Sequence, residues 1–218
     1  MILTTRPEKT AHLSLNSLKE NGLEATNLPC FELGIVKAIQ PHWERYQGIF
    51  FSSPQVFDFI PSKWMPHILK IPMKYAIGEK TAKLAPFPCH WLKKSKPIQE
   101  ASRDLPIDIK WIHLCSAQTK AQNLSLPWDN VPIYEPLLAS KFQETHQKLN
   151  WQKITHILFY SGSSVEHFFS QKPMIHLRDQ KLVCVGTSAA EKMSSFGYHF
   201  IEFQKNQLQH LYQYLQGS

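Results

Sequence analysis

The sequence lacks the long apolar runs and the short motifs that mark several large classes of protein. No apolar run approaches the roughly 18 residues that a membrane-spanning helix needs, so no membrane span is predicted. It contains no GxGxxG, no GxxxxGK(S/T) and no HExxH, so no dinucleotide site, P-loop or zinc-protease site is predicted. The stretch YSGSS is not a GxSxG nucleophile elbow, because the flanking glycines are missing. We therefore expect no cofactor and no metal.

Cysteine is scarce and scattered. The four cysteines are Cys30, Cys89, Cys115 and Cys184, and none belongs to a CxxC pair. Three of them lie in or beside apolar runs, a pattern typical of buried, reduced thiols. The opening MILTTRP also lacks the charged start, long apolar core and cleavage site of a signal peptide. We expect a cytoplasmic protein whose cysteines are structural.

The net charge is basic. Lys and Arg exceed Asp and Glu by 24 − 17 = +7, which favours an acidic partner such as nucleic acid, anionic lipid or a polyanionic small molecule. The cluster WLKKSK at Trp91–Lys96 mixes an aromatic residue with lysines and could touch nucleic acid. One short cluster is more typical of a solvated loop, so we expect no nucleic-acid partner and no membrane partner. A basic surface without a dedicated ligand stays open as the alternative.

Short apolar runs alternate with helical patterns along the chain. Ala11, Leu15 and Leu18 share one face of a predicted helix that Gly22 would end, and a second apolar stripe occupies 208–215. Strands that alternate with helices predict an α/β fold, with parallel sheets covered by helices on both faces. The predicted strands are 2–5, 23–28, 31–36 and 48–54, then MKYAIG, KWIHLC, VPIY, HILFYSGSS, KLVCVGTS and YHFIEF.

Two parts of the chain resemble each other at a fixed offset. YAIGEKTAKLA and CVGTSAAEKM each read as a short strand, a glycine, a hydroxyl-bearing turn and a helix start. Their glycines are Gly78 and Gly186, and 186 − 78 = 108. The earlier strand ends FFSSP and FYSGSS align at Ser53 and Ser161, and 161 − 53 is also 108. Two matched features at one offset predict two similar α/β domains.

Hydroxyl side chains and glycines gather where the predicted strands end. Open parallel sheets bind ligands outside the carboxyl ends of their strands, and Gly78 and Gly186 would let the backbone turn tightly beside a ligand. The helix starts that follow favour a carboxylate by roughly 0.3–1 kcal/mol each. A single Ser or Thr there is more often a plain N-cap, so the candidate site depends on the whole set. The candidate hydroxyls are Ser52, Ser53, Thr81, Ser161, Ser163, Thr187 and Ser188.

Seven motifs, spread over essentially the whole chain, occur in an order and spacing typical of one family. They are ILTTRP, GLEATNLPCFEL, FFSSP, AIGEKTAKLA, VPIYEP, FYSGSS and VGTSAAEKMSSFG. On these motifs the sequence resembles the uroporphyrinogen-III synthases. It departs from their pattern at Thr187 and Ala189, which replace a proline and a threonine, and at Gly162, which replaces a proline. LCSAQTK at Leu114–Lys120 also replaces a glycine-rich turn.

The resemblance implies two flavodoxin-like α/β domains that face each other across a cleft and are joined by two linker strands. Domain one would comprise residues 1–30 plus 137–218, and domain two residues 31–136. The implied activity is a lyase reaction of porphyrin and heme biosynthesis. The enzyme dehydrates and cyclises hydroxymethylbilane, a linear tetrapyrrole polycarboxylate, and inverts the last pyrrole ring to give uroporphyrinogen III. We expect a monomer that needs no cofactor.

The resemblance also implies roles for single residues. Tyr134 matches the family's tyrosine, a candidate catalytic group that protonates or orients the leaving hydroxyl; the alternative is a tyrosine that caps a strand. Arg6 matches the arginine of T-R-P and either binds substrate or is structural. The implied substrate-binding positions are Ser53, Thr81, Ser161 and Ser188, with the backbone near Gly78 and Gly186. The alternative function is a non-catalytic two-domain clamshell that binds an anionic small molecule and does not need Tyr134.

Overall fold

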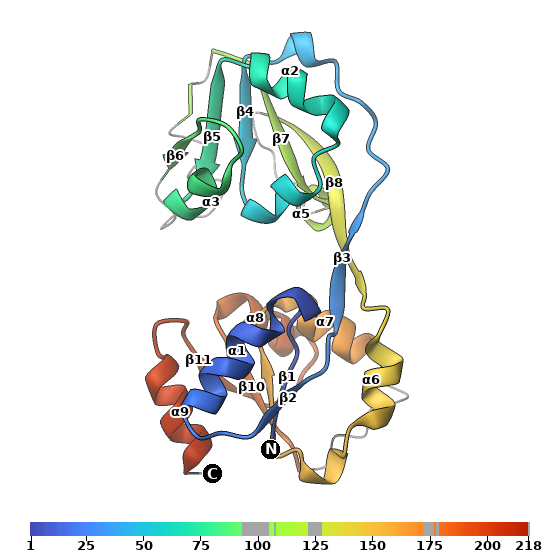
Figure 1. Ribbon diagram of the computed structural model, residues 1–218, viewed down its shortest axis with the longest axis vertical. Coiled ribbons are helices and arrows are strands. Elements are labelled where there is room, and N and C mark those ends of the chain that lie inside the picture. Colours follow the sequence, from blue (N-terminus) through green and yellow to red (C-terminus); the bar gives the residue numbers. More distant parts are fainter. Residues whose placement is uncertain (93–104, 107, 122–127, 172–176, 178, 218) are drawn as a thin grey trace. The chain divides into compact units, whose positions relative to one another are not determined.

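The structure is a computed structural model of the chain (Figure 1). No helix in the part of the chain that it describes is long and apolar enough to cross a membrane. The lysines of the WLKKSK cluster lie outside the described residues. The described residues are 1–92, 105–106, 108–121, 128–171, 177 and 179–217.

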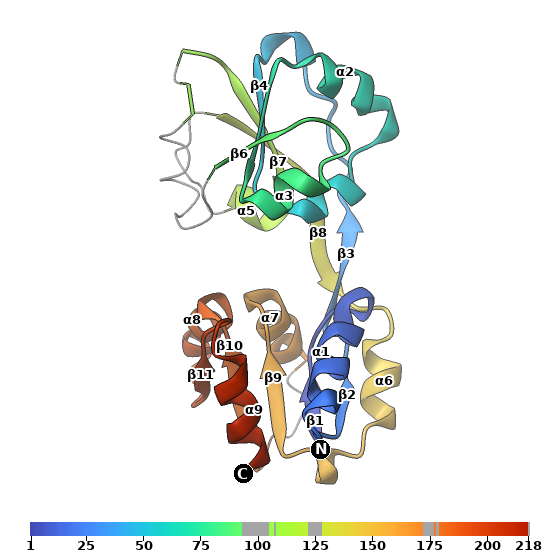
Figure 2. The same cartoon turned by 60° about the vertical axis from the view of Figure 1, so that its left-hand side comes forward.

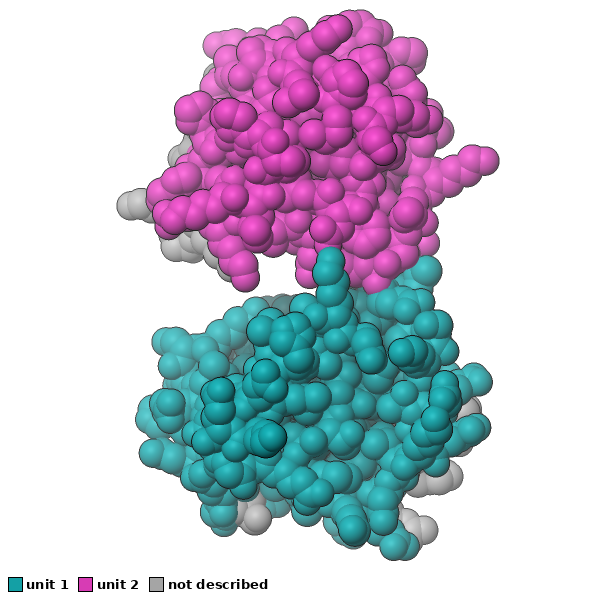
Figure 3. Space-filling view, viewed as in Figure 1, with its two compact units in different colours: residues 1–32, 136–218 teal, residues 33–135 magenta. Residues whose placement is uncertain are grey.

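The chain divides into two compact units, which Figure 3 distinguishes by colour. Unit 1 comprises Met1–Glu32 and Pro136–Ser218, and unit 2 comprises Leu33–Glu135. That each unit folds as an independent domain, with the boundaries expected from the sequence, stays a prediction.

Unit 1 is built on a sheet with the strand order β11-β10-β9-β1-β2, and every pair of neighbours in it is parallel. Its strands are β1 (Ile2–Thr4), β2 (Ala25–Asn27), β9 (His156–Phe159), β10 (Lys181–Val185) and β11 (Ile201–Phe203). Its helices are α1 (Glu8–Glu20), α6 (Phe142–Lys148), α7 (Gly162–Ser170), α8 (Thr187–Ser195) and α9 (Leu208–Gln216).

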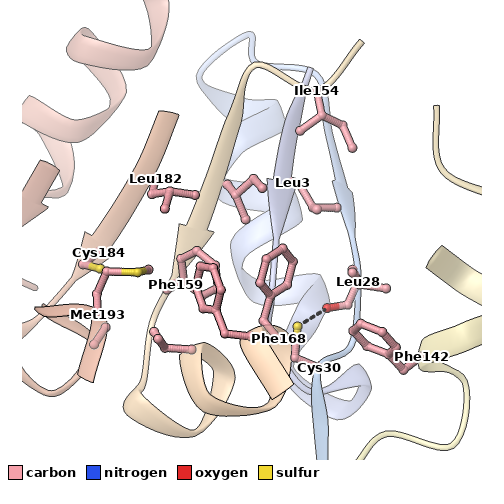
Figure 4. Packing of buried hydrophobic residues seen from close by; sticks show 14 of the residues in the cluster. Leu3, Leu28, Cys30, Phe142, Ile154, Phe159, Phe168, Leu182, Cys184 and Met193 are labelled. Atoms are coloured by element: carbon pink, nitrogen blue, oxygen red, sulfur yellow. Dashed lines mark hydrogen bonds between the residues drawn. The ribbon is translucent and has the colours of Figure 1, made fainter. Parts of the chain in front are cut away.

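Helices cover both faces of this sheet. Successive residues of a strand point to opposite faces, so neighbouring residues pack against different helices. Leu3 and Phe159 pack with residues of α6, α7 and α8 in one buried cluster, part of which Figure 4 shows. Ile2 and Leu158, each adjacent in sequence to one of these residues, pack on the other face with α1 and α9, which lie together in Figures 1 and 2. The continuous apolar runs of the strands therefore reflect burial on both faces.

Unit 2 is built on a sheet with the strand order β3-β8-β7-β4-β5-β6. Its strands are β3 (Phe31–Ile35), β4 (Gly48–Phe51), β5 (Met73–Ile77), β6 (His90–Leu92), β7 (Trp111–Ser116) and β8 (Trp128–Leu138). Its α-helices are α2 (Met65–Lys70), α3 (Glu79–Leu84) and α5 (Ala117–Ala121), and its 3-10 helices are η1 (Trp43–Arg45), η2 (Pro54–Asp58) and η3 (Ser62–Trp64). In unit 1, η5 (Trp151–Lys153) precedes β9.

The two faces of the unit 2 sheet are filled differently. On one face, Ile49 and Phe51 pack with Val56, Trp64 and Ile68 of the helices that follow β4. The other face carries a smaller, mainly aromatic cluster whose buried members are Phe50, Leu105, Trp111 and Trp128.

The strands that connect the units pair with each other. The N–H of Val36 donates to the carbonyl of Ile133 over 3.1 Å, and the N–H of Ala139 donates to that of Cys30 over 3.4 Å. The paired residue number on the β8 side falls from 139 to 133 as the number on the β3 side rises from 30 to 36, so β3 and β8 are antiparallel. The other neighbouring pairs of this sheet, β8 with β7, β7 with β4, β4 with β5 and β5 with β6, are parallel. The predicted α/β class with parallel sheets is confirmed, with one antiparallel edge.

The structure confirms the predicted repeat. β4 and β5 begin at Gly48 and Met73, and β9 and β10 begin at His156 and Lys181, so both offsets are 108. The register of β4 with β5 is also the same as that of β9 with β10, because Gly48 pairs with Met73 as His156 pairs with Lys181. We call two positions that differ by 108 in this segment repeat-related.

Smaller predictions have mixed outcomes. The four cysteines are free, and all except the half-buried Cys89 are buried, as expected. The strand predicted at 23–28 is only three residues long, and VPIY is part of a strand of eleven. In the predicted first helix Ala11 and Leu18 are buried, but Ser14 takes the inner position between them while Leu15 is half-buried.

Candidate functional site

The candidate residues fall into two sets, one in each unit, and all of them except Tyr134, which lies within β8, follow the carboxyl ends of parallel strands. Such strand ends are where open α/β sheets bind their ligands. The set in unit 1 is Arg6, Ser161, Ser163, Gly186, Thr187 and Ser188. The set in unit 2 is Ser52, Ser53, Gly78, Thr81 and Tyr134.

In unit 1 the starts of α7 and α8 lie against each other. The N–H of Gly162 donates to Oγ of Ser188 over 3.3 Å. A Cβ on Gly162 would lie 3.0 Å from the carbonyl oxygen of Ser188, so any larger residue would push this carbonyl away by a few tenths of an ångström. Two positive helix ends therefore lie together here, and Thr187 and Ser188 are exposed beside them.

Ser161 caps its own helix. Its Oγ accepts a hydrogen bond from the N–H of Ser164 over 3.2 Å, and Oγ of Ser164 donates to the carbonyl oxygen of Ser161 over 2.8 Å. The N-cap that the sequence left open as the alternative is therefore present here. Ser163, on the first turn of α7, is half-buried.

A lysine that the motifs did not indicate lies at the start of α8. Gly186 has a left-handed φ of 99°, and its N–H donates to the carbonyl of Phe203 over 2.8 Å. A Cβ there would lie 2.9 Å from Cε of Lys205, so the lysine stem runs across the glycine. A lysine beside a helix start strengthens the preference of this edge for an anion. Lys205 lies eight residues beyond Gly197, the end of the last motif, which is why it was missed.

Arg6 lies over an aromatic ring at the same edge of unit 1. Its guanidinium carbon is 3.8 Å from the centre of the Tyr160 ring. Asn27 holds the backbone of Arg6, because its Oδ1 accepts from the Arg6 N–H and its Nδ2 donates to the Arg6 carbonyl, both over 3.1 Å. Burial raises the pKa of Tyr160 to about 12, although Arg6 opposes the rise. The tyrosine therefore stays neutral and forms no ion pair with Arg6.

In unit 2, Tyr134 is buried at the end of the sheet. Only 6% of the residue is exposed, and its ring stacks on Phe59 with 5.2 Å between the ring centres. Burial raises the pKa of the phenol above its ordinary value, and a side-chain hydrogen bond with Ser53 opposes this. The phenol is therefore protonated at neutral pH and acts as a hydrogen-bond donor rather than as a strong acid.

Ser53 also caps a helix, since its Oγ accepts from the N–H of Gln55 at the start of η2 over 3.4 Å. Gly78 has a φ of 78° and precedes α3, as its repeat-related partner Gly186 precedes α8. Glu79 fills the first turn of α3, so this helix start attracts an anion less than that of α8. Thr81 is 5% exposed and offers little surface to a ligand.

Three polar residues form a hydrogen-bonded chain that the sequence did not reveal. Oγ of Ser52 lies 2.9 Å from Nε2 of His113, and Nδ1 of His113 lies 2.8 Å from Oδ1 of Asn130. Oδ1 also accepts from the indole N–H of Trp128 over 3.1 Å. His113 lies in β7, and both of its ring nitrogens have a hydrogen-bond partner. Its partners could not be inferred, because they depend on the register of three strands.

Among the described residues, no group of three or more His, Cys, Asp or Glu side chains could hold a metal ion.

A surface pocket of unit 2 lies away from the candidate residues. It is near the amino ends of β4 and β5, at the opposite end of the sheet. It is lined by Trp43, Glu44, Tyr46, His67, Lys70 and Ile71.

Comparison with known proteins gives both a sequence relative and structural neighbours, although no family model matches the chain. A porphyrin biosynthesis protein HemD from Ruminiclostridium josui is 21% identical over 94% of this chain. The alignment covers 46% of that protein, so the chain spans about half the length of the curated relative it matches.

Two solved structures have the same fold. The uroporphyrinogen-III synthetase of Helicobacter pylori has a TM-score of 0.64 at 13% identity, covering 92% of this chain and 91% of its own. A mutant uroporphyrinogen III synthase of Thermus thermophilus has a TM-score of 0.61 at 13% identity, covering 100% of both chains. The fold expected from the seven motifs is therefore confirmed: this chain has the fold of the uroporphyrinogen-III synthases.

Proposed function

We propose that this protein is a uroporphyrinogen-III synthase, an enzyme of porphyrin biosynthesis. The observation that carries the proposal is the alignment with a porphyrin biosynthesis protein over 94% of the chain. The fold shared with two synthases over at least 92% of the chain supports it. As a lyase, the protein would remove the terminal hydroxyl of hydroxymethylbilane, invert the last ring and close the macrocycle.

The charges of unit 1 suit a substrate with many carboxylates. Arg6 lies over Tyr160 at one strand end, and Lys205 lies beside the paired starts of α7 and α8. These groups would hold carboxylates and fix the shape of the linear tetrapyrrole. Fixing the shape matters because ring closure without inversion is the uncatalysed outcome, so positioning supplies much of the catalysis.

Tyr134 is the proposed catalytic residue. Its protonated phenol would donate a hydrogen bond to the leaving hydroxyl and so stabilise the departing oxygen. Thr81 and Ser163, and the backbone near Gly78, are proposed to play at most supporting roles, because both side chains are at least half-buried. We further propose that the protein acts as a cytoplasmic monomer without a cofactor.

The test is the identity of the product. The purified protein is mixed with freshly made hydroxymethylbilane, the products are oxidised, and the uroporphyrin isomers are separated by chromatography. We expect mostly isomer III, in an amount that depends on the protein. Only isomer I, formed at the rate of the buffer control, would refute the synthase and favour the non-catalytic clamshell that binds an anionic small molecule.

We predict that Tyr134→Phe slows the formation of isomer III by about 10- to 100-fold. The effect falls at the lower end of general acid catalysis, because the phenol is a weak acid. The measurement is the initial rate of isomer III at saturating substrate.

Tyr46→Phe is the matched control for this change. It also removes a phenol oxygen from unit 2, one that donates a hydrogen bond to Asp129 over 2.7 Å. This change should leave the rate of isomer III formation within about twofold of wild type. A Tyr134→Phe enzyme as fast as the Tyr46→Phe enzyme would remove Tyr134 from the reaction.

A further inference from the structure

We infer that the chain Ser52–His113–Asn130 fixes the Ser52 hydroxyl as a hydrogen-bond acceptor, so that this edge of unit 2 binds a donor group of the ligand, a pyrrole N–H, and not a carboxylate. The choice of a pyrrole rests on the proposed function. Ser52 is the binding residue in this inference, and His113 and Asn130 are positioning residues.

The direction of each hydrogen bond follows from the chemistry of the four groups. An indole N–H can only donate, so the Asn130 atom that it reaches, 3.1 Å from Trp128 Nε1, is the amide oxygen. The same oxygen lies 2.8 Å from Nδ1 of His113, so Nδ1 carries the ring proton. In the neutral ring Nε2 is then the acceptor, and Ser52, 2.9 Å away, donates its only hydroxyl proton to it.

The surroundings keep His113 neutral. The residue is 0% exposed and packs against the rings of Phe50 and Trp128, with ring centres 5.3 and 5.7 Å away. Burial lowers its pKa to about 4, although the hydrogen bond from its Nδ1–H to Asn130 opposes the shift. At neutral pH the direction of the chain therefore does not reverse.

The half-buried Ser52 is left with only oxygen lone pairs to offer. A carboxylate placed against them would meet a negative dipole, whereas an N–H or O–H group would find an acceptor. The same connectivity occurs in serine hydrolases, where the histidine removes the serine proton. A buried histidine with a pKa of about 4 is a poor base, so the geometry points to orientation of Ser52 rather than to its use as a nucleophile.

At this place the repeat gives the two units corresponding rows of paired strand residues. Phe50, His113 and Asn130 form one row across unit 2, and Leu158, Thr4 and Asn27 form the corresponding row in unit 1. Both rows end in an asparagine whose oxygen accepts from the middle residue, over 2.7 Å in the case of Thr4.

Beyond these rows the two edges differ in charge. Unit 1 presents Arg6 over Tyr160, which is repeat-related to Ser52 since 160 − 52 = 108. One edge therefore carries a cation that suits carboxylates, and the other carries an acceptor that suits ring N–H groups.

The test compares two monopyrroles that each carry one acetate and one propionate side chain, one with a free ring N–H and one N-methylated. Binding is measured by NMR titration of the full chain. Wild type should bind the N–H pyrrole roughly tenfold more tightly, the scale of one neutral hydrogen bond. Ser52→Ala and His113→Phe should each reduce this preference to within twofold, and the double variant should lose no more than either single one.

Each outcome decides the inference. Equal affinity of wild type for the two pyrroles, or binding of neither, would overturn it, as would a preference that survives in Ser52→Ala. Labelling of Ser52 by a fluorophosphonate would show a nucleophile and would overturn it as well. A structural effect of His113→Phe alone would weaken both pyrroles equally, so the ratio of affinities separates positioning from damage.

The outcome does not depend on turnover. A protein that makes no isomer III but discriminates between the pyrroles keeps this subsite and loses the synthase. A protein that makes isomer III without discrimination keeps the synthase and loses the subsite.

Discussion

Replacing Gly48 with alanine is expected to lower the free energy of unfolding by about 3 kcal/mol. Gly48 begins β4 and pairs directly with Trp111 of β7. A Cβ on Gly48 would lie 2.3, 2.4 and 2.5 Å from three carbons of the Trp111 ring. Carbon atoms pack best at about 3.5–4.0 Å, so the ring would have to move by more than an ångström.

The ring has no room for that movement. Trp111 is 1% exposed, and its indole N–H donates to the carbonyl of Pro106 over 2.9 Å. It also meets Tyr75 edge to face, with 5.7 Å between the ring centres. Any shift of the ring therefore breaks a hydrogen bond or an aromatic contact, which is why the expected cost is at the upper end for an added methyl group.

Denaturant unfolding of Gly48→Ala measures the effect, and the Trp111→Leu background provides the control. With the large ring gone, the added methyl group should cost less than about 1 kcal/mol. A loss of similar size in both backgrounds would mean that the ring contact is not the cause. The repeat-related residue in unit 1 is His156, which tolerates its side chain because its partner in β1 is Ile2.

Much of the fold could be predicted because it depends on local patterns. The apolar runs of β4, β5, β9 and β10 and the left-handed Gly78 and Gly186 are visible in the letters, and the constant offset of 108 identified the repeat. The length of β8 was missed, because Trp128 and Leu138 continue the strand through polar residues and two prolines. Pairing with β7 and β3, not propensity, keeps these residues extended.

The places of the candidate residues in the fold were predictable, but their contacts were not. Arg6, Ser161 and Tyr134 were placed by motif, yet the Asn27 that holds Arg6 and the Phe59 that stacks on Tyr134 were not. These partners come from other strands and helices, and no short pattern encodes a contact between residues so far apart in the sequence. The sequence also does not distinguish a strand-end hydroxyl that caps a helix, such as Ser161, from one that donates to a buried histidine, such as Ser52.

Acid should destabilise unit 2 through the protonation of His113. The unfolded chain binds a proton at this histidine near pH 6.5, but the folded chain binds it only near pH 4. Stability from this group is therefore complete above about pH 6.5 and is lost as the pH falls toward 4. The loss reaches (6.5 − 4) × 1.36, or roughly 3 kcal/mol.

The neighbours of His113 do not reverse this sign. Phe50, Trp128, Ser52 and Asn130 contact it and are all uncharged. In the same unit, hydrogen bonding to Tyr46 lowers the pKa of Asp129 below its ordinary value of 3.8. Stability from Asp129 is therefore lost only below about pH 4, outside the window of His113.

Tryptophan fluorescence can isolate the effect, because five of the six tryptophans lie in unit 2 and only Trp151 lies in unit 1. Urea unfolding is followed at pH 7 and at pH 4.5 for wild type, His113→Phe and the exposed-histidine control His90→Phe. Wild type and His90→Phe should lose roughly 2–3 kcal/mol more than His113→Phe between the two pH values. Because other groups titrate in all three proteins alike, equal losses in wild type and His113→Phe would mean that the buried ring accepts a proton without opening the fold.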